Sequence, residues 1–110
     1  MSKNHQIRST MESDEILRML LPTFLQHLSN AIKELHKGLK EESWKNLGTV
    51  AHRLKGSAGT YGFPDIVTTI EAFERELKNK SRKDVLLLHI LKLQELSKYI
   101  VIDNHTDDTN

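Results

Sequence analysis

Apolar residues recur at intervals of three and four along most of the chain, which is the spacing of an amphipathic helix face. Three segments carry such a stripe: Leu21, Leu25, Leu28, Ile32, Leu35 and Leu39; then Trp44, Leu47, Ala51, Leu54, Ala58 and Tyr61; then Ile66, Ile70, Phe73 and Leu77. In a fourth segment, residues 85–96, apolar side chains cover more than half of the girth, so we expect the most buried helix there. We also expect the aromatic side chains to pack in the core, namely Phe24, Trp44, Tyr61, Phe63 and Phe73.

Capping residues and prolines divide these segments. A helix start is indicated near Ser13, and Pro22 predicts that this first helix is short and that a second one begins at the proline. Ser43 is a candidate N-cap for the helix that follows. Gly62 can adopt the left-handed conformation that ends a helix, and Pro64 suits the first turn of the next one.

The fold class that follows is all-α, because strand-like alternation is absent and the two prolines fall at expected helix starts. Short connections predict an antiparallel up-down-up-down four-helix bundle, with the short extra N-terminal helix laid across one end. Residues 13–102 would form this single domain. Residues 1–12 are predicted to be a flexible arm and residues 103–110 a disordered tail, because both are polar and lack a periodic apolar pattern.

Charge is nearly balanced, with 16 Lys and Arg against 15 Asp and Glu and a formal net charge of +1, so nucleic acid and anionic membranes are not expected partners. The absence of cysteine excludes disulfides and thiol catalysis and is typical of a reducing cytoplasm. No run approaches the roughly 18 apolar residues of a membrane span, so we expect a soluble cytoplasmic protein. Two acid–base pairs on the third apolar segment are interpreted as solvated surface pairs: Glu71 with Arg75, and Glu74 with Lys78.

His52 lies away from the apolar stripe of its own helix, by projection roughly 130° from the centre of that stripe. Gly48 comes four residues before it, Gly56 four after and Gly59 seven after, so the glycines share its side of the helix. A glycine inside a helix costs about 1 kcal/mol relative to alanine, and these glycines therefore indicate clearance for something large that approaches the imidazole. Close helix packing is the alternative; it could account for Gly48 but accounts poorly for Gly56.

Other uses of the histidines find little support in the sequence. Six histidines are present, but neither the His-x-x-x-His nor the Glu-x-x-His spacing occurs, so no metal site is predicted, and elemental analysis would test this. Ser57 projects to another side of the helix than His52, which argues against a hydrolytic triad. Phosphate-loop and dinucleotide-binding patterns are absent, so we expect no ATP binding and no cofactor.

Phosphoryl transfer needs what His52 and its neighbours offer. A neutral imidazole nitrogen is a nucleophile, and the transfer demands mainly in-line access and charge compensation. Lys55 lies one turn along the helix and can offset the roughly two negative charges of a phosphohistidine. Gly48 and Gly56 leave no side chain above or below the ring, so the loops of a partner, with any Mg²⁺ that they hold, could reach it.

The run from Ala51 to Ala58, followed by Gly62, closely resembles the signature of histidine-containing phosphotransfer (HPt) domains. Residues 22–25 and 71–77 also resemble the flanking segments of that family. The resemblance implies a four-helix bundle whose exposed histidine takes a phosphoryl group from a receiver-domain aspartate or a sensor kinase and passes it to a response-regulator aspartate. It implies a phosphocarrier without ATP-dependent kinase activity of its own.

The same resemblance assigns roles to individual residues. His52 would be the phosphorylated residue, Lys55 its basic neighbour and Gly56 the small residue beneath the imidazole. Receiver domains of response regulators and a hybrid sensor histidine kinase are the implied partners, with Mg²⁺ held only by the partner receiver domain. A monomer is expected.

The partner-binding surface is expected around the histidine, because a small transient interface combines accessible apolar positions with a few basic groups. On helix geometry its residues are Lys45, Gly48, Thr49, Arg53 and Gly59. The alternative function is a non-catalytic helical adaptor that binds receiver or kinase domains through the same face. Partner binding that survives His52→Ala, with no detectable phosphoryl transfer, would favour the adaptor.

Overall fold

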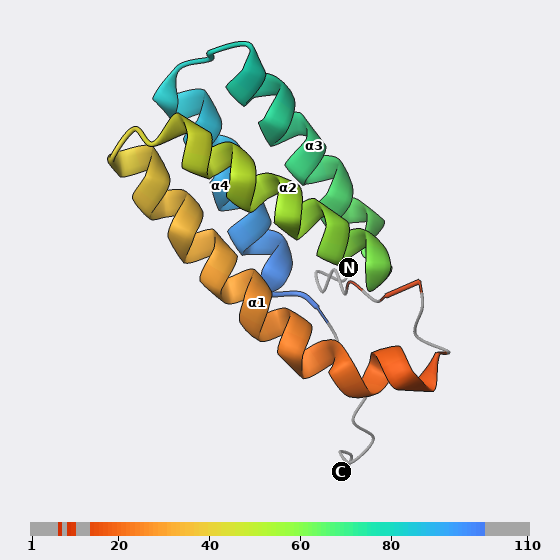
Figure 1. Ribbon diagram of the computed structural model, residues 1–110. Helices are drawn as coiled ribbons and strands as arrows, with labels where there is room; N and C mark the ends of the chain where they lie inside the picture. The colour runs from red at the N-terminus through yellow and green to blue at the C-terminus, as the bar shows by residue number, and fades with distance from the viewer. Residues whose placement is uncertain (1–6, 8, 11–13, 101–110) are drawn as a thin grey trace.

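The computed structural model describes residues 7, 9–10 and 14–100, and within them the chain folds into a bundle. Its helices are α1 (Glu15–Lys40), α2 (Trp44–Thr60), α3 (Pro64–Lys78) and α4 (Lys83–Ser97). Successive helices run in opposite directions, with α2 flanked by α1 and α3 and with α4 on the far side of the bundle (Figure 1). The predicted all-α up-down-up-down bundle is confirmed. Among the described helices, none combines the length and apolarity needed to cross a membrane.

The prediction of a short extra N-terminal helix is wrong, because those residues form the first part of α1. Asp14 caps this helix, its side chain accepting hydrogen bonds from the backbone N–H groups of Ile16 at 3.0 Å and Leu17 at 3.2 Å. The helix continues through Pro22, which removes one backbone N–H but leaves the buried side chains of Leu21 and Phe24 anchored in the core. The first turns are instead bent away from the rest of α1 (Figure 1). Ser13, the predicted start, lies outside the described residues.

The connections on either side of α2 match the predicted helix ends. Ser43 occupies the N-cap position of α2, although its side chain makes no capping hydrogen bond. At the other end Gly62 has a φ of 77°, in the left-handed region that favours glycine. The N–H of Phe63 then donates to the carbonyl of Ala58 at 2.9 Å, and Pro64 is the first residue of α3. Because α2 ends and α3 begins within a few residues, the two helices lie side by side and antiparallel.

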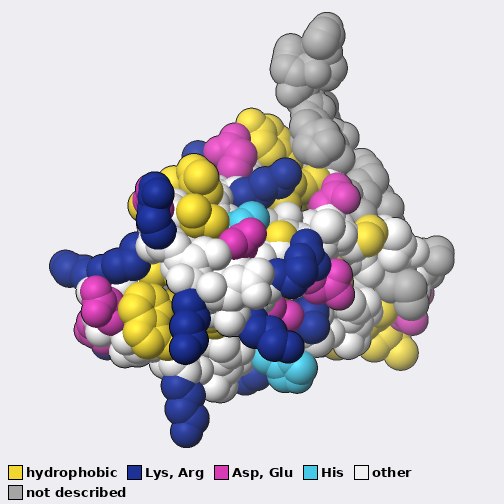
Figure 2. Space-filling view, turned by 90° about the horizontal axis from the view of Figure 1, so that it is seen from above, with side chains coloured by type: hydrophobic (Ala, Val, Ile, Leu, Met, Phe, Trp, Pro, Cys, Tyr) yellow, Lys and Arg dark blue, Asp and Glu magenta, His cyan; other side chains and the backbone are white. Residues whose placement is uncertain are grey.

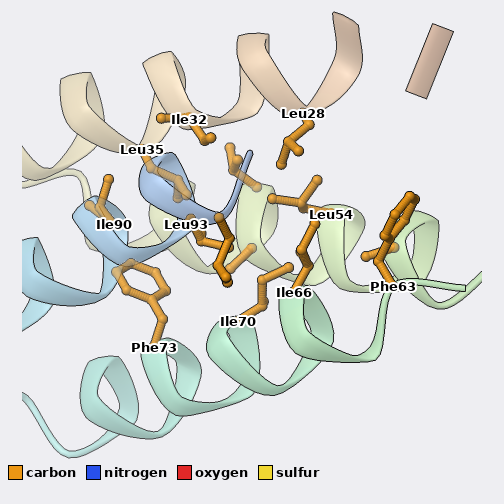
Figure 3. Close-up of a cluster of buried hydrophobic side chains, with 14 of the residues drawn as sticks. Leu28, Ile32, Leu35, Leu54, Phe63, Ile66, Ile70, Phe73, Ile90 and Leu93 are labelled. Carbon is orange, nitrogen blue, oxygen red and sulfur yellow. The ribbon is translucent and has the colours of Figure 1, made fainter. Parts of the chain in front are cut away.

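The core is formed by apolar side chains from all four helices, as Figure 3 shows for ten labelled residues. At the end where α2 joins α3, the ring of Phe24 stacks on Phe63 with centroids 5.3 Å apart and on Tyr61 at 4.9 Å. Phe24, Phe63 and Phe73 are fully buried, as predicted for these aromatic residues. Trp44 is an exception, because the first residue of α2 lies at the end of the bundle with 46% of its surface exposed.

The prediction that residues 85–96 form the most buried helix is also wrong. Among the described helices, α4 packs against α1 and α3, and its inner face comprises Leu86, Ile90, Leu93 and Leu96. Two of its leucines face outward, Leu88 with 66% and Leu91 with 43% of their surface exposed. A helix with two neighbours can bury one side, so the additional apolar residues stay on the surface.

The prediction of a flexible arm over residues 1–12 does not hold for Ile7, Ser9 and Thr10, the residues of that range that the structure describes. Ile7 is buried and forms a parallel β-bridge with Ile100, its N–H donating to the carbonyl of Tyr99 at 2.8 Å. Thr10 N–H donates to the carbonyl of Gly62 at 2.6 Å. The physical reason is that the ends of α2 and α4 offer free carbonyl groups and an apolar site for Ile7. The predicted tail, residues 103–110, lies outside the described residues.

Candidate phosphoryl-acceptor site on helix α2

Helix α2 presents His52 to solvent because its opposite side is fixed in the core. Its buried side chains are Leu47, Val50, Ala51, Leu54 and Ala58. This confirms the inner part of the predicted stripe, and the helical period then directs His52 outward. The imidazole side chain is 78% exposed, so a macromolecular partner can reach it.

The ring of His52 has one nitrogen near an acidic group and the other away from it. Nδ1 lies 3.8 Å from Oε2 of Glu74, a residue of α3. This distance is longer than a hydrogen bond but short enough for a direct electrostatic interaction. Of the two neutral tautomers, Glu74 favours the one with its proton on Nδ1, and the Nε2 lone pair on the other edge of the ring is then available.

Lys55 reaches the same carboxylate from one turn further along α2. Its Nζ lies 3.0 Å from Oε1 of Glu74, and the two side chains are 31% and 25% exposed. Glu74 therefore faces the histidine with one oxygen and binds the lysine with the other. The predicted surface pair of Glu74 and Lys78 is wrong, because the Glu74 carboxylate points toward α2 and binds Lys55 instead.

The sequence reasoning missed Glu74 as a site residue, although a signal was present. Glu74 lies four residues after Ile70 and three before Leu77, which places it on the apolar side of α3 rather than on its outer face. An acidic residue in that position must find a partner on the neighbouring helix, and α2 supplies His52 and Lys55.

The glycines around His52 are not required for packing. A β-carbon added at Gly56 or Gly59 would meet no atom within 4 Å, and one at Gly48 would make only an ordinary contact with Leu77 at 3.7 Å. Gly38 of α1 provides the contrast, because a β-carbon there would lie 3.0 Å from Cδ2 of Leu47. The geometry thus argues against close helix packing as the reason for Gly56 and agrees with clearance beside the imidazole.

The predicted partner-binding residues are distributed along the accessible side of α2. Lys45, Thr49, Arg53 and Gly59 are exposed and Gly48 is partly buried. Thr49 donates its hydroxyl to the carbonyl of Lys45 at 3.1 Å, while Arg53 leans toward α1 with Nη2 3.5 Å from Oε1 of Glu34. These residues therefore lie before and after His52 along α2.

A cavity of about 270 Å³ lies between α1 and α2 next to Arg53. Its walls come from both helices: His27, Asn30, Ala31, Glu34, Val50, Arg53, Leu54 and Ser57. The α1 residues were not foreseen, because the pairing of α1 with this side of α2 is a tertiary feature. They extend the accessible surface around the site from one helix to two.

Two further features of the described residues were candidates for a second site, the charged side chains on the surface and the possible metal ligands. Lys and Arg side chains are interspersed with Asp and Glu on the face shown in Figure 2, which looks at the end of the bundle at the top of Figure 1. Within the described residues, no three His, Asp or Glu side chains gather as a metal site would require. His36 instead pairs its Nε2 with Oε1 of Gln94 at 2.9 Å.

The family model described as "Hpt domain" matches residues 19–99, which span α1 from its second turn, the whole of α2 and α3, and α4. No curated protein and no solved structure matches the chain.

Proposed function

We propose that this chain, which belongs to the Hpt domain family of two-component phosphotransfer domains, accepts a phosphoryl group on His52 and passes it to a response-regulator aspartate. The observation that carries the proposal is the exposed His52 imidazole with Nδ1 facing Glu74 and with open space at Gly56. The family supplies phosphotransfer as the general function. The choice of residue rests on this geometry.

The chemical step needs only a lone pair and a donor. Neutral His52 attacks the phosphorus of a receiver-domain aspartyl phosphate through Nε2, forming an N–P bond as the P–O bond to the aspartate breaks. The aspartate leaves as a carboxylate. The phosphorylated ring is then positively charged beside Glu74, until its Nδ1 proton is released to solvent. In the reverse step, toward a second aspartate, the N–P bond breaks as the P–O bond forms, and the ring takes a proton back on Nδ1 so that the neutral imidazole is restored.

Lys55 and Gly56 serve this step in different ways. Lys55 binds the same carboxylate that faces the ring, and its ammonium would compensate charge on the phosphoryl group after a side-chain rotation. Gly56 leaves room beside the ring for the loops of the partner. This chain then needs no cofactor of its own, and the Mg²⁺ of the reaction belongs to the partner receiver domain.

Receiver domains and a hybrid sensor kinase would dock around His52. We place the contact on the exposed residues of α2, chiefly Lys45, Thr49 and Arg53, and on the α1 side of the adjoining cavity. Gly48 and Gly59 would allow close approach of the partner backbone. Such an interface is small and transient, as a relay between successive partners requires.

The test is transfer from aspartyl-phosphorylated receiver domains of the source organism, each mixed separately with the chain. We expect an acid-labile, base-stable phosphoprotein, and loss of it in His52→Gln. Partner binding without transfer, unaffected by His52→Ala, would instead support the helical adaptor.

A further inference from the structure

The ion pair between Lys55 and Glu74 is the best-defined electrostatic contact of the site. Its atoms lie 3.0 Å apart, and both side chains are largely sheltered between α2 and α3. The neighbouring pair of Arg53 and Glu34 is looser, at 3.5 Å, with side chains 68% and 53% exposed. The Lys55–Glu74 interaction is therefore less screened by solvent than the other ion pair beside His52.

We propose that Glu74 lowers the stability of phosphorylated His52 by competing with the phosphoryl group for Lys55. This inference rests on the proposed function and adds a determinant of the phosphoryl equilibrium to it. Glu74 acts here as a positioning residue, because it works through the lysine.

The competition follows from the arrangement of the three groups. Glu74 lies at the Nδ1 edge of His52, whereas a phosphoryl group on Nε2 is held at the other edge. If Lys55 turns to the phosphoryl group, it gives up the contact with Glu74, and the sheltered carboxylate loses its positively charged partner. If Lys55 stays between them, the carboxylate lies next to a doubly charged anion. Both arrangements raise the free energy of the phosphorylated state relative to the unmodified one.

Glu74 also has an opposite effect while phosphorylated His52 keeps its Nδ1 proton, since its carboxylate, 3.8 Å from Nδ1, then stabilises the positively charged ring. The measurement is therefore made at about pH 8.5, above the ordinary histidine pKa of about 6.5 and below the ordinary lysine pKa of about 10.4. At this pH the comparison is directed at the competition for Lys55.

The experiment equilibrates the full chain with potassium phosphoramidate and ammonium at about pH 8.5, where imidazole nitrogen replaces ammonia on phosphorus and no partner protein is needed. Phosphohistidine is quantified residue by residue from ¹⁵N imidazole spectra. For Glu74→Gln we expect an equilibrium constant for phosphorylated His52 about two- to fivefold higher than in the parent, the range for a partly exposed ion pair. His27, on α1, is the internal reference, and its phosphorylation equilibrium should be the same in Glu74→Gln and the parent.

Two further variants make the result specific. Glu71→Gln removes the same charge from an exposed position of α3 and should leave the His52 equilibrium within experimental error. In a Lys55→Gln background, Glu74→Gln should have a smaller effect, because the competition for the cation is gone and only the direct repulsion between carboxylate and phosphoryl group remains. An unchanged or lower equilibrium constant in Glu74→Gln, or an undiminished effect without Lys55, would overturn the inference. A chain that shows the Glu74 effect with phosphoramidate but accepts nothing from any receiver domain would refute the proposed function alone.

Discussion

Replacing Gly56 with alanine separates the needs of the fold from those of the site. Gly56 lies inside α2, and a β-carbon there would meet no atom within 4 Å. Nothing therefore offsets the gain in helix propensity, and we expect the free energy of unfolding to rise by up to about 1 kcal/mol. The same methyl group lies one turn from His52, where loops of a partner must come down onto the imidazole. We expect phosphoryl transfer from a receiver domain to slow by about tenfold or more, since small displacements of reacting groups have large effects on rate.

Urea unfolding and single-turnover transfer measure the two effects on the same sample. Gly59→Ala is the first control, because it also enters open space but lies two turns from His52; it should stabilise similarly and slow transfer less. Gly38→Ala is the second, because its methyl group would press on Leu47 at 3.0 Å and should stabilise less than Gly56→Ala. A Gly56→Ala protein that unfolds more easily and transfers normally would show that this glycine serves packing and that our interpretation is wrong.

Two further predictions concern stability. Leu54 is 4% exposed on the buried face of α2, so Leu54→Ala should lower the free energy of unfolding by about 2 to 5 kcal/mol in urea titrations; a loss well under 1 kcal/mol would contradict its place in the core. At the start of α4, hydrogen bonding from Arg82 lowers the pKa of Asp84, and the folded-state pKa therefore lies below the unfolded one. Any stability from this carboxylate is present above the unfolded pKa, near 4, and is lost as pH falls through the folded pKa. The difference in urea midpoint between the parent and Asp84→Asn should accordingly shrink below about pH 4; a constant difference would refute the linkage.

The regular parts of the fold were predictable because they depend on local sequence. Helical periodicity gives the inward faces of α1, α2 and α3, and Gly62 followed by Pro64 gives the break between α2 and α3. Pro22 misled the prediction because a proline indicates an interruption locally, while the buried side chains around it keep the helix continuous. Ile7 lies among polar residues, and its burial depends on pairing with Ile100 at the other end of the sequence.

The candidate site shows the same division between local and tertiary information. The outward direction of His52 and the open space at Gly56 follow from the period of one helix. The partners of Glu74 were not predictable from one helix, because they depend on how α3 lies against α2. The walls of the cavity beside Arg53 likewise depend on the packing of α1 on α2.

The central claim is that His52 carries the phosphoryl group, and mapping the modified residue tests it most directly. The chain is phosphorylated by an aspartyl-phosphorylated receiver domain and digested under alkaline conditions that preserve phosphohistidine, and the peptides are sequenced by mass spectrometry. The account predicts phosphate on the peptide that contains His52 and none on any peptide from His52→Gln. Phosphate on another histidine, such as the exposed His27, with undiminished labelling of His52→Gln, would contradict it.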